Sequence, residues 1–253
     1  MNFDQSVLDV LFDHLPKQLI LQRYGAGRGK ELSSGKFTNP ASSSALVANV
    51  FGIFLEEPRR FALPPKIAHY GTPIAIQIEQ ELRFPWRGGL HPWLDVTVET
   101  ETHLIGIESK RYEPFRDKKS LFSEAFQRHV WGDDMRQFEL LRDDLKRGFL
   151  HLDPVQLTKH AFALRTQAVK RSKIGVLVYL YAEPTAFPDG RTVLPDALNQ
   201  HRAEVARFAK AVDGAEVCFH AMTYRQLLDW WIADGDDGIK DHAASIDRHY
   251  RLG

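Results

Sequence analysis

The sequence has very few of the features that mark secreted or membrane proteins. Cys218 is the only cysteine among 253 residues, which excludes an internal disulfide and a thiolate zinc cluster and is compatible with a reducing cytosol. There is no stretch of about 18 apolar residues, and the acidic N-terminus lacks the basic segment and apolar run of a secretion signal. We therefore expect a cytoplasmic protein without a membrane-spanning segment.

The sequence also lacks an excess of charge, internal repeats and low-complexity tracts. Lysine plus arginine and aspartate plus glutamate number 33 each, so any nucleic-acid site must be a local patch. With 43% hydrophobic residues, the chain can bury the core of a single domain. We expect this domain, 1–253, to contain an N-terminal helix and flexible arm (1–43), an α/β core (44–235) and a C-terminal extension (236–253).

The order of expected elements indicates an α/β fold. Apolar residues at helical spacing predict a core-facing helix that starts near Ser44 and ends before Pro58. The later helical patterns are 121–145, 153–164, 194–212 and 224–232, and the extended runs are 74–82, 93–99, 104–110, 174–181 and 216–221. Long crossovers make some strand pairs parallel, so the expected fold is a mixed central sheet flanked by helices.

The runs 93–99 and 104–110 predict a hairpin in which two carboxylates face each other. Side chains alternate between the two faces of a strand, and one face receives the apolar residues Leu94, Val96, Val98, Ile105 and Ile107. Asp95, Glu108 and Lys110 then share the other face. If the turn is centred on residues 101 and 102, the numbers of paired residues add up to 203. Asp95 then lies opposite Glu108.

This arrangement favours metal-dependent phosphodiester hydrolysis. Opposed residues have Cβ atoms roughly 5 Å apart, where two carboxylates repel each other unless a cation lies between them. Carboxylate oxygens suit Mg²⁺ or Mn²⁺, and Lys110 would stabilise the charge of the transition state or orient a water molecule. The alternative is an exposed hairpin face with solvated charges, since D-x12-E-x-K also arises by chance.

The segment HPWLDVTVETETHLIGIESKRYEPF resembles the PD-(D/E)XK phosphodiesterase superfamily, whose fold is restriction endonuclease-like. The chain is also similar to bacterial restriction endonuclease domains through GKFTNPASSSALVANVFG, LDPVQLTKHAF, VYLYAEP and HRAEVARFAKAVDGAEVCFHAMTYRQLLDWW. Together these segments lie within residues 25–235. The resemblance implies a Mg²⁺-dependent endonuclease, with Mn²⁺ able to substitute, that acts on DNA in restriction or another DNA-processing role.

By this resemblance, Asp95 and Glu108 would be metal ligands, the backbone carbonyl of Ser109 a further ligand, and Lys110 the catalytic lysine. The sequence departs from the superfamily pattern because Leu94, rather than proline, precedes Asp95. Members often add an acidic ligand from the first helix, which here offers only Asn49 internally. The auxiliary ligand therefore stays open among Glu31, Glu79 and Glu81.

Two groups of basic residues are candidates for contacts with DNA phosphates. Arg111 and Lys119 follow the proposed site, and Lys170, Arg171 and Lys173 precede the strand 174–181. A solvated loop explains such clusters equally well.

Other functions stay open beside the nuclease. A catalytically silent member of the same fold would bind nucleic acid or protein as a module. A zinc hydrolase is a weaker alternative, because the eleven histidines contain no H-E-x-x-H motif and His91, His103 and His160 fit surface or core positions better. The need to cut both strands of a duplex suggests a homodimer.

Overall fold

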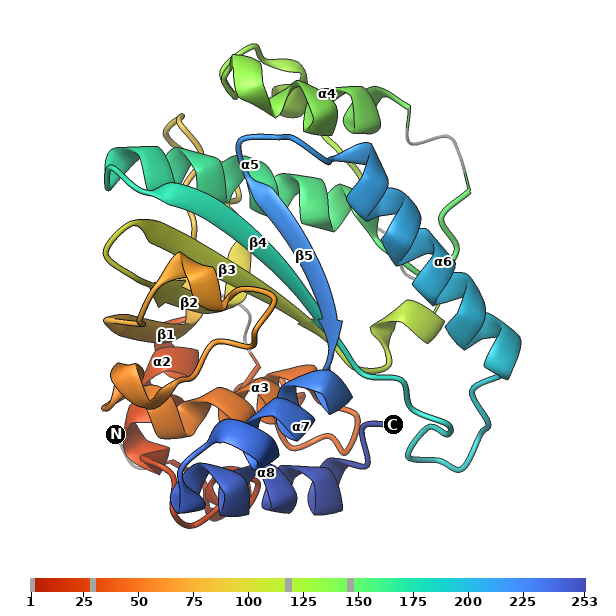
Figure 1. The fold of residues 1–253 in the computed structure, drawn as a ribbon. Coiled ribbons are helices and arrows are strands. Elements are labelled where there is room, and N and C mark those ends of the chain that lie inside the picture. Colours follow the sequence, from red (N-terminus) through yellow and green to blue (C-terminus); the bar gives the residue numbers. More distant parts are fainter. Residues whose placement is uncertain (1–2, 28–30, 117–119, 145–147) are drawn as a thin grey trace.

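A five-stranded mixed sheet forms the centre of the computed structural model, which describes residues 3–27, 31–116, 120–144 and 148–253 (Figure 1). The strands lie in chain order: β1 (Ala75–Glu81), β2 (Trp93–Glu99), β3 (His103–Lys110), β4 (Ile174–Tyr181) and β5 (Cys218–Thr223). Strands β1, β2 and β3 pair antiparallel, whereas β3, β4 and β5 pair parallel. The predicted α/β fold with a mixed central sheet is confirmed.

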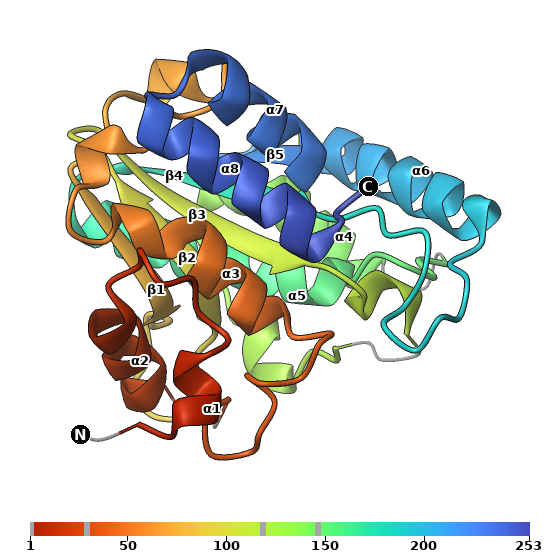
Figure 2. The same ribbon diagram turned by 90° about the horizontal axis from the view of Figure 1, so that it is seen from below.

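Helices cover both faces of this sheet. In Figure 1 one face carries α5 (Pro154–Lys170), with α4 (Arg136–Asp143) and α6 (Pro195–Ala211) on the same side. Figure 2 shows the other face, which α3 (Ser43–Phe51), α7 (Tyr224–Asp234) and α8 (Asp237–Tyr250) cover beside α1 (Gln5–Leu8) and α2 (Lys17–Ala26). The 3-10 helices are η1 (Gly52–Phe54), η2 (Pro58–Arg60), η3 (Ala68–Tyr70), η4 (Glu113–Phe115), η5 (Glu124–Gln127) and η6 (Asp133–Met135).

The β2–β3 hairpin has the predicted register. Val96 pairs with Ile107 and Glu99 pairs with Leu104, so the paired numbers add up to 203 as expected. The predicted apolar face is wrong at one position, because Leu94 packs in the core beneath α5 rather than with Val96. A Cβ atom at Gly106 would lie 2.4 Å from Leu94 Cδ1. The glycine thus leaves the space that Leu94 fills.

The predicted helix 121–145 is also wrong over most of its length. Among its described residues, 121–144, only α4 is an α-helix, and it follows the short 3-10 helices η5 and η6. Gly132 has φ +94°, a conformation that interrupts any helix, and Trp131 stacks on Phe162 of α5 with ring centroids 4.2 Å apart. Tertiary packing of the aromatic side chains therefore replaces local helix formation in this segment.

Asn49, in the middle of α3, ties both ends of the chain to the core. Its side chain is fully buried, accepts a hydrogen bond from Phe12 N at 2.9 Å and donates to Val10 O and to Tyr250 Oη at 3.0 and 2.7 Å. The segment 236–253, expected as an extension, forms α8 and packs on α3 and α7. Within the described ranges, no helix is long and apolar enough to cross a membrane.

Candidate active site

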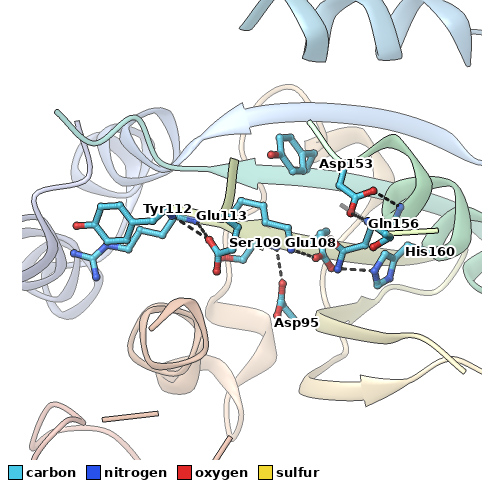
Figure 3. Close-up of polar contacts among 12 residues, drawn as sticks. Asp95, Glu108, Ser109, Tyr112, Glu113, Asp153, Gln156 and His160 are labelled. Atoms are coloured by element: carbon cyan, nitrogen blue, oxygen red, sulfur yellow. Dashed lines mark hydrogen bonds and ion pairs between the residues drawn. The ribbon is translucent and has the colours of Figure 1, made fainter. Parts of the chain in front are cut away.

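The structure brings Asp95, Glu108 and Lys110 together where β2 begins and β3 ends. Figure 3 shows Asp95 and Glu108 at this place. Asp95 Oδ2 accepts a hydrogen bond from Ser109 N at 2.7 Å, and Lys110 Nζ forms an ion pair with Glu108 Oε1. Glu108 is only 2% exposed. A short turn between adjacent strands fixes this arrangement, because the register determines which residues of the two strands meet.

Both carboxylates of this group are hard to ionise. Burial raises the pKa of Asp95 well above its ordinary value, and the neighbouring Glu108 raises it further, while Lys110 and the Ser109 N–H act in the opposite direction. Burial also raises the pKa of Glu108, against the opposing effect of Lys110. Bound cations stabilise carboxylates of this kind, because the positive charge replaces the lost solvation.

Lys110 is positively charged at neutral pH. Burial lowers its pKa, but Glu108, Asp95 and Glu113 raise it more, so the pKa lies above the ordinary value of a lysine. Such a side chain supplies a positive charge and N–H hydrogen-bond donors and does not act as a proton acceptor. Its amino group therefore suits the stabilisation of negative charge on a phosphate.

Glu113 is a member of the site that the sequence reasoning missed. Its carboxylate accepts hydrogen bonds from Arg111 N at 2.8 Å and from Tyr112 N at 3.0 Å. Burial raises the pKa of Glu113, but Lys110, the Ser43 hydroxyl and the backbone N–H groups bring it below the ordinary value. An ionised carboxylate thus stands close to Lys110. The only signal in the sequence is its position three residues after Lys110.

His160 of α5 is the second residue that was missed as part of the site. Its Nε2 lies 3.3 Å from Glu108 Oε2, and burial lowers the pKa of His160 to about 3, so the imidazole is neutral at pH 7. A histidine in a helix carries no local signal of a contact with a strand 52 positions earlier. Only the packing of α5 on β3 reveals it.

The three candidates for the auxiliary acid differ in their coupling to the site. Burial, followed by Asp95, Glu31 and Glu108, raises the pKa of Glu79 to about 8. Glu79 also has φ +54°, in the left-handed region that non-glycine residues rarely adopt. Glu81 instead pairs with Arg83 at 3.2 Å. The electrostatics therefore favour Glu79, with Glu31 behind it, over Glu81.

A cavity of about 590 Å³ opens beside Lys110. The N-terminal ends of two helices border it, at Ser42 before α3 and at Asp153 before α5. Each of these caps accepts a hydrogen bond from the first turn of its helix. Cationic side chains of Lys36 and Arg116 also line the cavity, whose volume is in the range of ligand-binding pockets.

Arg111 does not face this cavity. It is 6% exposed and donates to Pro40 O at 2.8 Å and to Tyr250 O at 2.9 Å. Its guanidinium also lies over the rings of Tyr112 and Tyr250. The structure therefore assigns Arg111 to packing between distant segments, contrary to its predicted contact with DNA. Lys119, the other basic residue predicted beside the site, lies outside the described residues.

The basic residues before β4 lie at the opposite end of the sheet. Strands β3 and β4 are parallel, Lys110 pairs with Tyr181, and Ile174 pairs with His103. At about 3.3 Å per residue, this places Lys170, Arg171 and Lys173 more than about 20 Å from Lys110. Arg171 and Lys173 also pair with Glu99, at 3.0 and 3.3 Å. These residues are not brought to the candidate site.

Asp95 and Glu108 fit a hard divalent cation. Within the part of the chain that the structure describes, no cluster of three or more His, Cys, Asp or Glu side chains is placed to hold a metal. Two buried carboxylates with raised pKa values nevertheless offer oxygen donors beside each other. Oxygen donors suit Mg²⁺ and Mn²⁺ better than zinc.

Comparison with known proteins gives one family match. The model of the family REase-ARP, described as Restriction Endonuclease associating with ARP, matches residues 15–251. No curated protein and no solved structure matches the sequence. The match extends over nearly the whole chain, and the mixed sheet flanked by helices is consistent with the restriction endonuclease-like fold. The chain therefore belongs to the family of restriction endonucleases associating with ARP.

Proposed function

We propose that this protein is a metal-dependent endonuclease that hydrolyses phosphodiester bonds of DNA. The proposal depends on one observation above all: Asp95, Glu108 and Lys110 meet at the ends of two adjacent strands, beside a polar cavity. Membership in a restriction endonuclease family suggests a nuclease-like function and DNA as the substrate.

Asp95, Glu108 and the Ser109 carbonyl would hold Mg²⁺, and Mn²⁺ would substitute for it. When bound, the ion supplies Lewis-acid activation of a phosphate oxygen and lowers the pKa of a bound water. Burial of both carboxylates strengthens their attraction for a cation, because little water competes for the charge. The strands hold these oxygen atoms in place before the cation arrives.

Lys110 would donate hydrogen bonds to the scissile phosphate. Its ammonium keeps its charge, because the surrounding carboxylates raise its pKa, and it lines the cavity that the substrate would enter. Negative charge grows on the phosphate oxygens as the nucleophile attacks, so a fixed positive charge stabilises the transition state more than the substrate. Lys36 and Arg116 would contact neighbouring phosphates along the same cavity.

The proposal is tested by incubating supercoiled plasmid and linear duplex DNA with the purified protein in Mg²⁺, Mn²⁺ or EDTA. We expect nicking or linearisation with either metal, none with EDTA, and a loss of activity in Asp95→Asn and Lys110→Ala. Lys170→Ala is the matched control, since this exposed lysine lies at the far end of the sheet.

Two results would contradict the proposal. Equal cleavage by the wild type and both site variants would show that another group, or a contaminant, cuts the DNA. Tight DNA binding without cleavage in any metal would instead identify a catalytically silent binding module.

A further inference from the structure

Among the described residues, the polar contact of the His160 ring is with Glu108. His160 is 2% exposed, and its Nε2 lies 3.3 Å from Glu108 Oε2. The other ring nitrogen, Nδ1, is buried and has no hydrogen-bond partner in the described part of the chain. Because a buried unpaired polar atom costs free energy, an apolar side chain would serve better if this position were needed only for packing.

We infer that His160 is a positioning residue, which donates a hydrogen bond from Nε2 to Glu108 Oε2 and so aims Glu108 Oε1 at the metal site. This inference rests on the proposed function, since it assigns Glu108 as a metal ligand. In the ionised form that pairs with Lys110 and would hold a cation, the oxygens of Glu108 only accept hydrogen bonds, so Nε2 carries the hydrogen.

The arrangement restricts rotation of the Glu108 carboxylate. Lys110 pairs with Oε1 and His160 lies 3.3 Å from Oε2, so the two oxygens have different partners. Figure 3 shows the contact between Glu108 and His160. His160 is fixed in turn, because α5 has 17 residues and packs on both β3 and β4. Partners behind a metal ligand reduce the entropy that the ligand loses when the metal binds.

Two substitutions separate this role from packing. In His160→Gln, the side-chain amide nitrogen is separated from Cα by the same number of bonds as Nε2 of the histidine. It can therefore still donate a hydrogen bond to Glu108. In His160→Asn the amide nitrogen corresponds to Nδ1 and faces away from Glu108. Both variants leave a polar amide at the same buried position, so their difference reports the hydrogen bond. Thr158→Val is the matched control: Thr158 is fully buried on the same helix, and its hydroxyl has no partner in the described residues.

The primary measurement is the affinity for Mn²⁺ of the full chain without DNA, by calorimetry or by electron paramagnetic resonance of the free ion. We expect His160→Asn to bind Mn²⁺ at least about tenfold more weakly, and His160→Gln to remain within about threefold of the wild type. Thr158→Val should bind as the wild type does. In a Glu108→Gln background, His160→Asn should weaken binding no further. Circular dichroism and Tm verify that each variant is folded.

Unchanged Mn²⁺ affinity in folded His160→Asn would overturn the inference, and so would equal losses in His160→Gln and His160→Asn. An absence of Mn²⁺ binding to the wild type would overturn it as well. A wild type that binds Mn²⁺ through Glu108 but cleaves no DNA would refute the proposed function alone. The role of His160 at the metal site would still be supported by the difference between the two variants.

Discussion

Replacing Glu79 with glutamine should stabilise the protein in a pH-dependent manner. Burial, with Asp95, Glu31 and Glu108 nearby, raises the pKa of Glu79 from 4.5 to about 8. The folded state therefore binds a proton at Glu79 more tightly than the unfolded state. The bound proton stabilises the folded state fully below pH 4.5, and this stabilisation is lost as the pH rises through 8. Glutamine has a similar shape and no proton to lose.

The magnitude follows from the two pKa values. Each tenfold difference in proton affinity is worth about 1.4 kcal/mol. Relative to a side chain that stays neutral, Glu79 therefore lowers the free energy of unfolding by about 3 kcal/mol at pH 7, where it stays mostly protonated in the folded state, and by on the order of 5 kcal/mol well above pH 8. These are large fractions of the free energy of unfolding of an ordinary domain. The protein loses this free energy of unfolding because it keeps a third acidic group beside the two proposed metal ligands.

Urea unfolding at pH 5, 7 and 9 measures this effect. The gain in the free energy of unfolding of Glu79→Gln over the wild type should be small at pH 5 and grow at each higher pH. Glu101→Gln, in the exposed turn between β2 and β3, controls for the loss of one negative charge. A gain that stays the same at every pH would refute the reasoning, because it would not come from ionisation.

Three further predictions concern the surroundings of the site. Gly106→Ala should destabilise the fold by about 1 to 3 kcal/mol in urea unfolding, because the added Cβ would lie 2.4 Å from Leu94 Cδ1; wild-type stability would contradict this contact. Arg111→Ala should lower Tm while leaving the salt dependence of DNA binding unchanged, since its guanidinium bonds Pro40 O and Tyr250 O; a shallower salt dependence would instead make Arg111 a phosphate contact. Burial lowers the pKa of His242 from 6.5 to about 4, so the free energy of unfolding of the wild type should fall by on the order of 3 kcal/mol between pH 6.5 and pH 4. His242→Gln should not show this fall, and parallel pH profiles of unfolding for the two proteins would contradict the prediction.

The sequence predicted the sheet well because the strands carry local signals. The bounds of β2 and β4 match the predicted runs, and the turn between β2 and β3 fixed the register that puts Val96 opposite Ile107. Strand β4 is an apolar run whose residues after Ile174 are all buried, as expected for an inner parallel strand. Tertiary packing decided the exceptions. Leu94 lies on the unexpected face because the space above Gly106 is free.

The candidate site was predictable only in part, for the same reason. Asp95, Glu108 and Lys110 belong to one hairpin, so its register predicted that they lie near one another, although the paired residues of the two strands end at Val96 and Ile107. His160 comes from α5, and its approach to Glu108 depends on how that helix packs on the sheet. Lys170 and Lys173 lie far from the site both in the sequence and in the structure. Only the parallel pairing of β3 with β4 shows which end of the sheet they occupy.

The most direct test of the proposed chemistry compares the wild type with Lys110→Met in a single turnover. A labelled DNA duplex is bound in Ca²⁺, and its affinity is measured there, before saturating Mg²⁺ starts the reaction. We predict that Lys110→Met binds within about threefold of the wild type and cleaves at least about a hundredfold more slowly, because a fixed charge acts mainly on the transition state. Equal cleavage rates for the two proteins would contradict the assignment of Lys110, and with it the active site proposed on this hairpin.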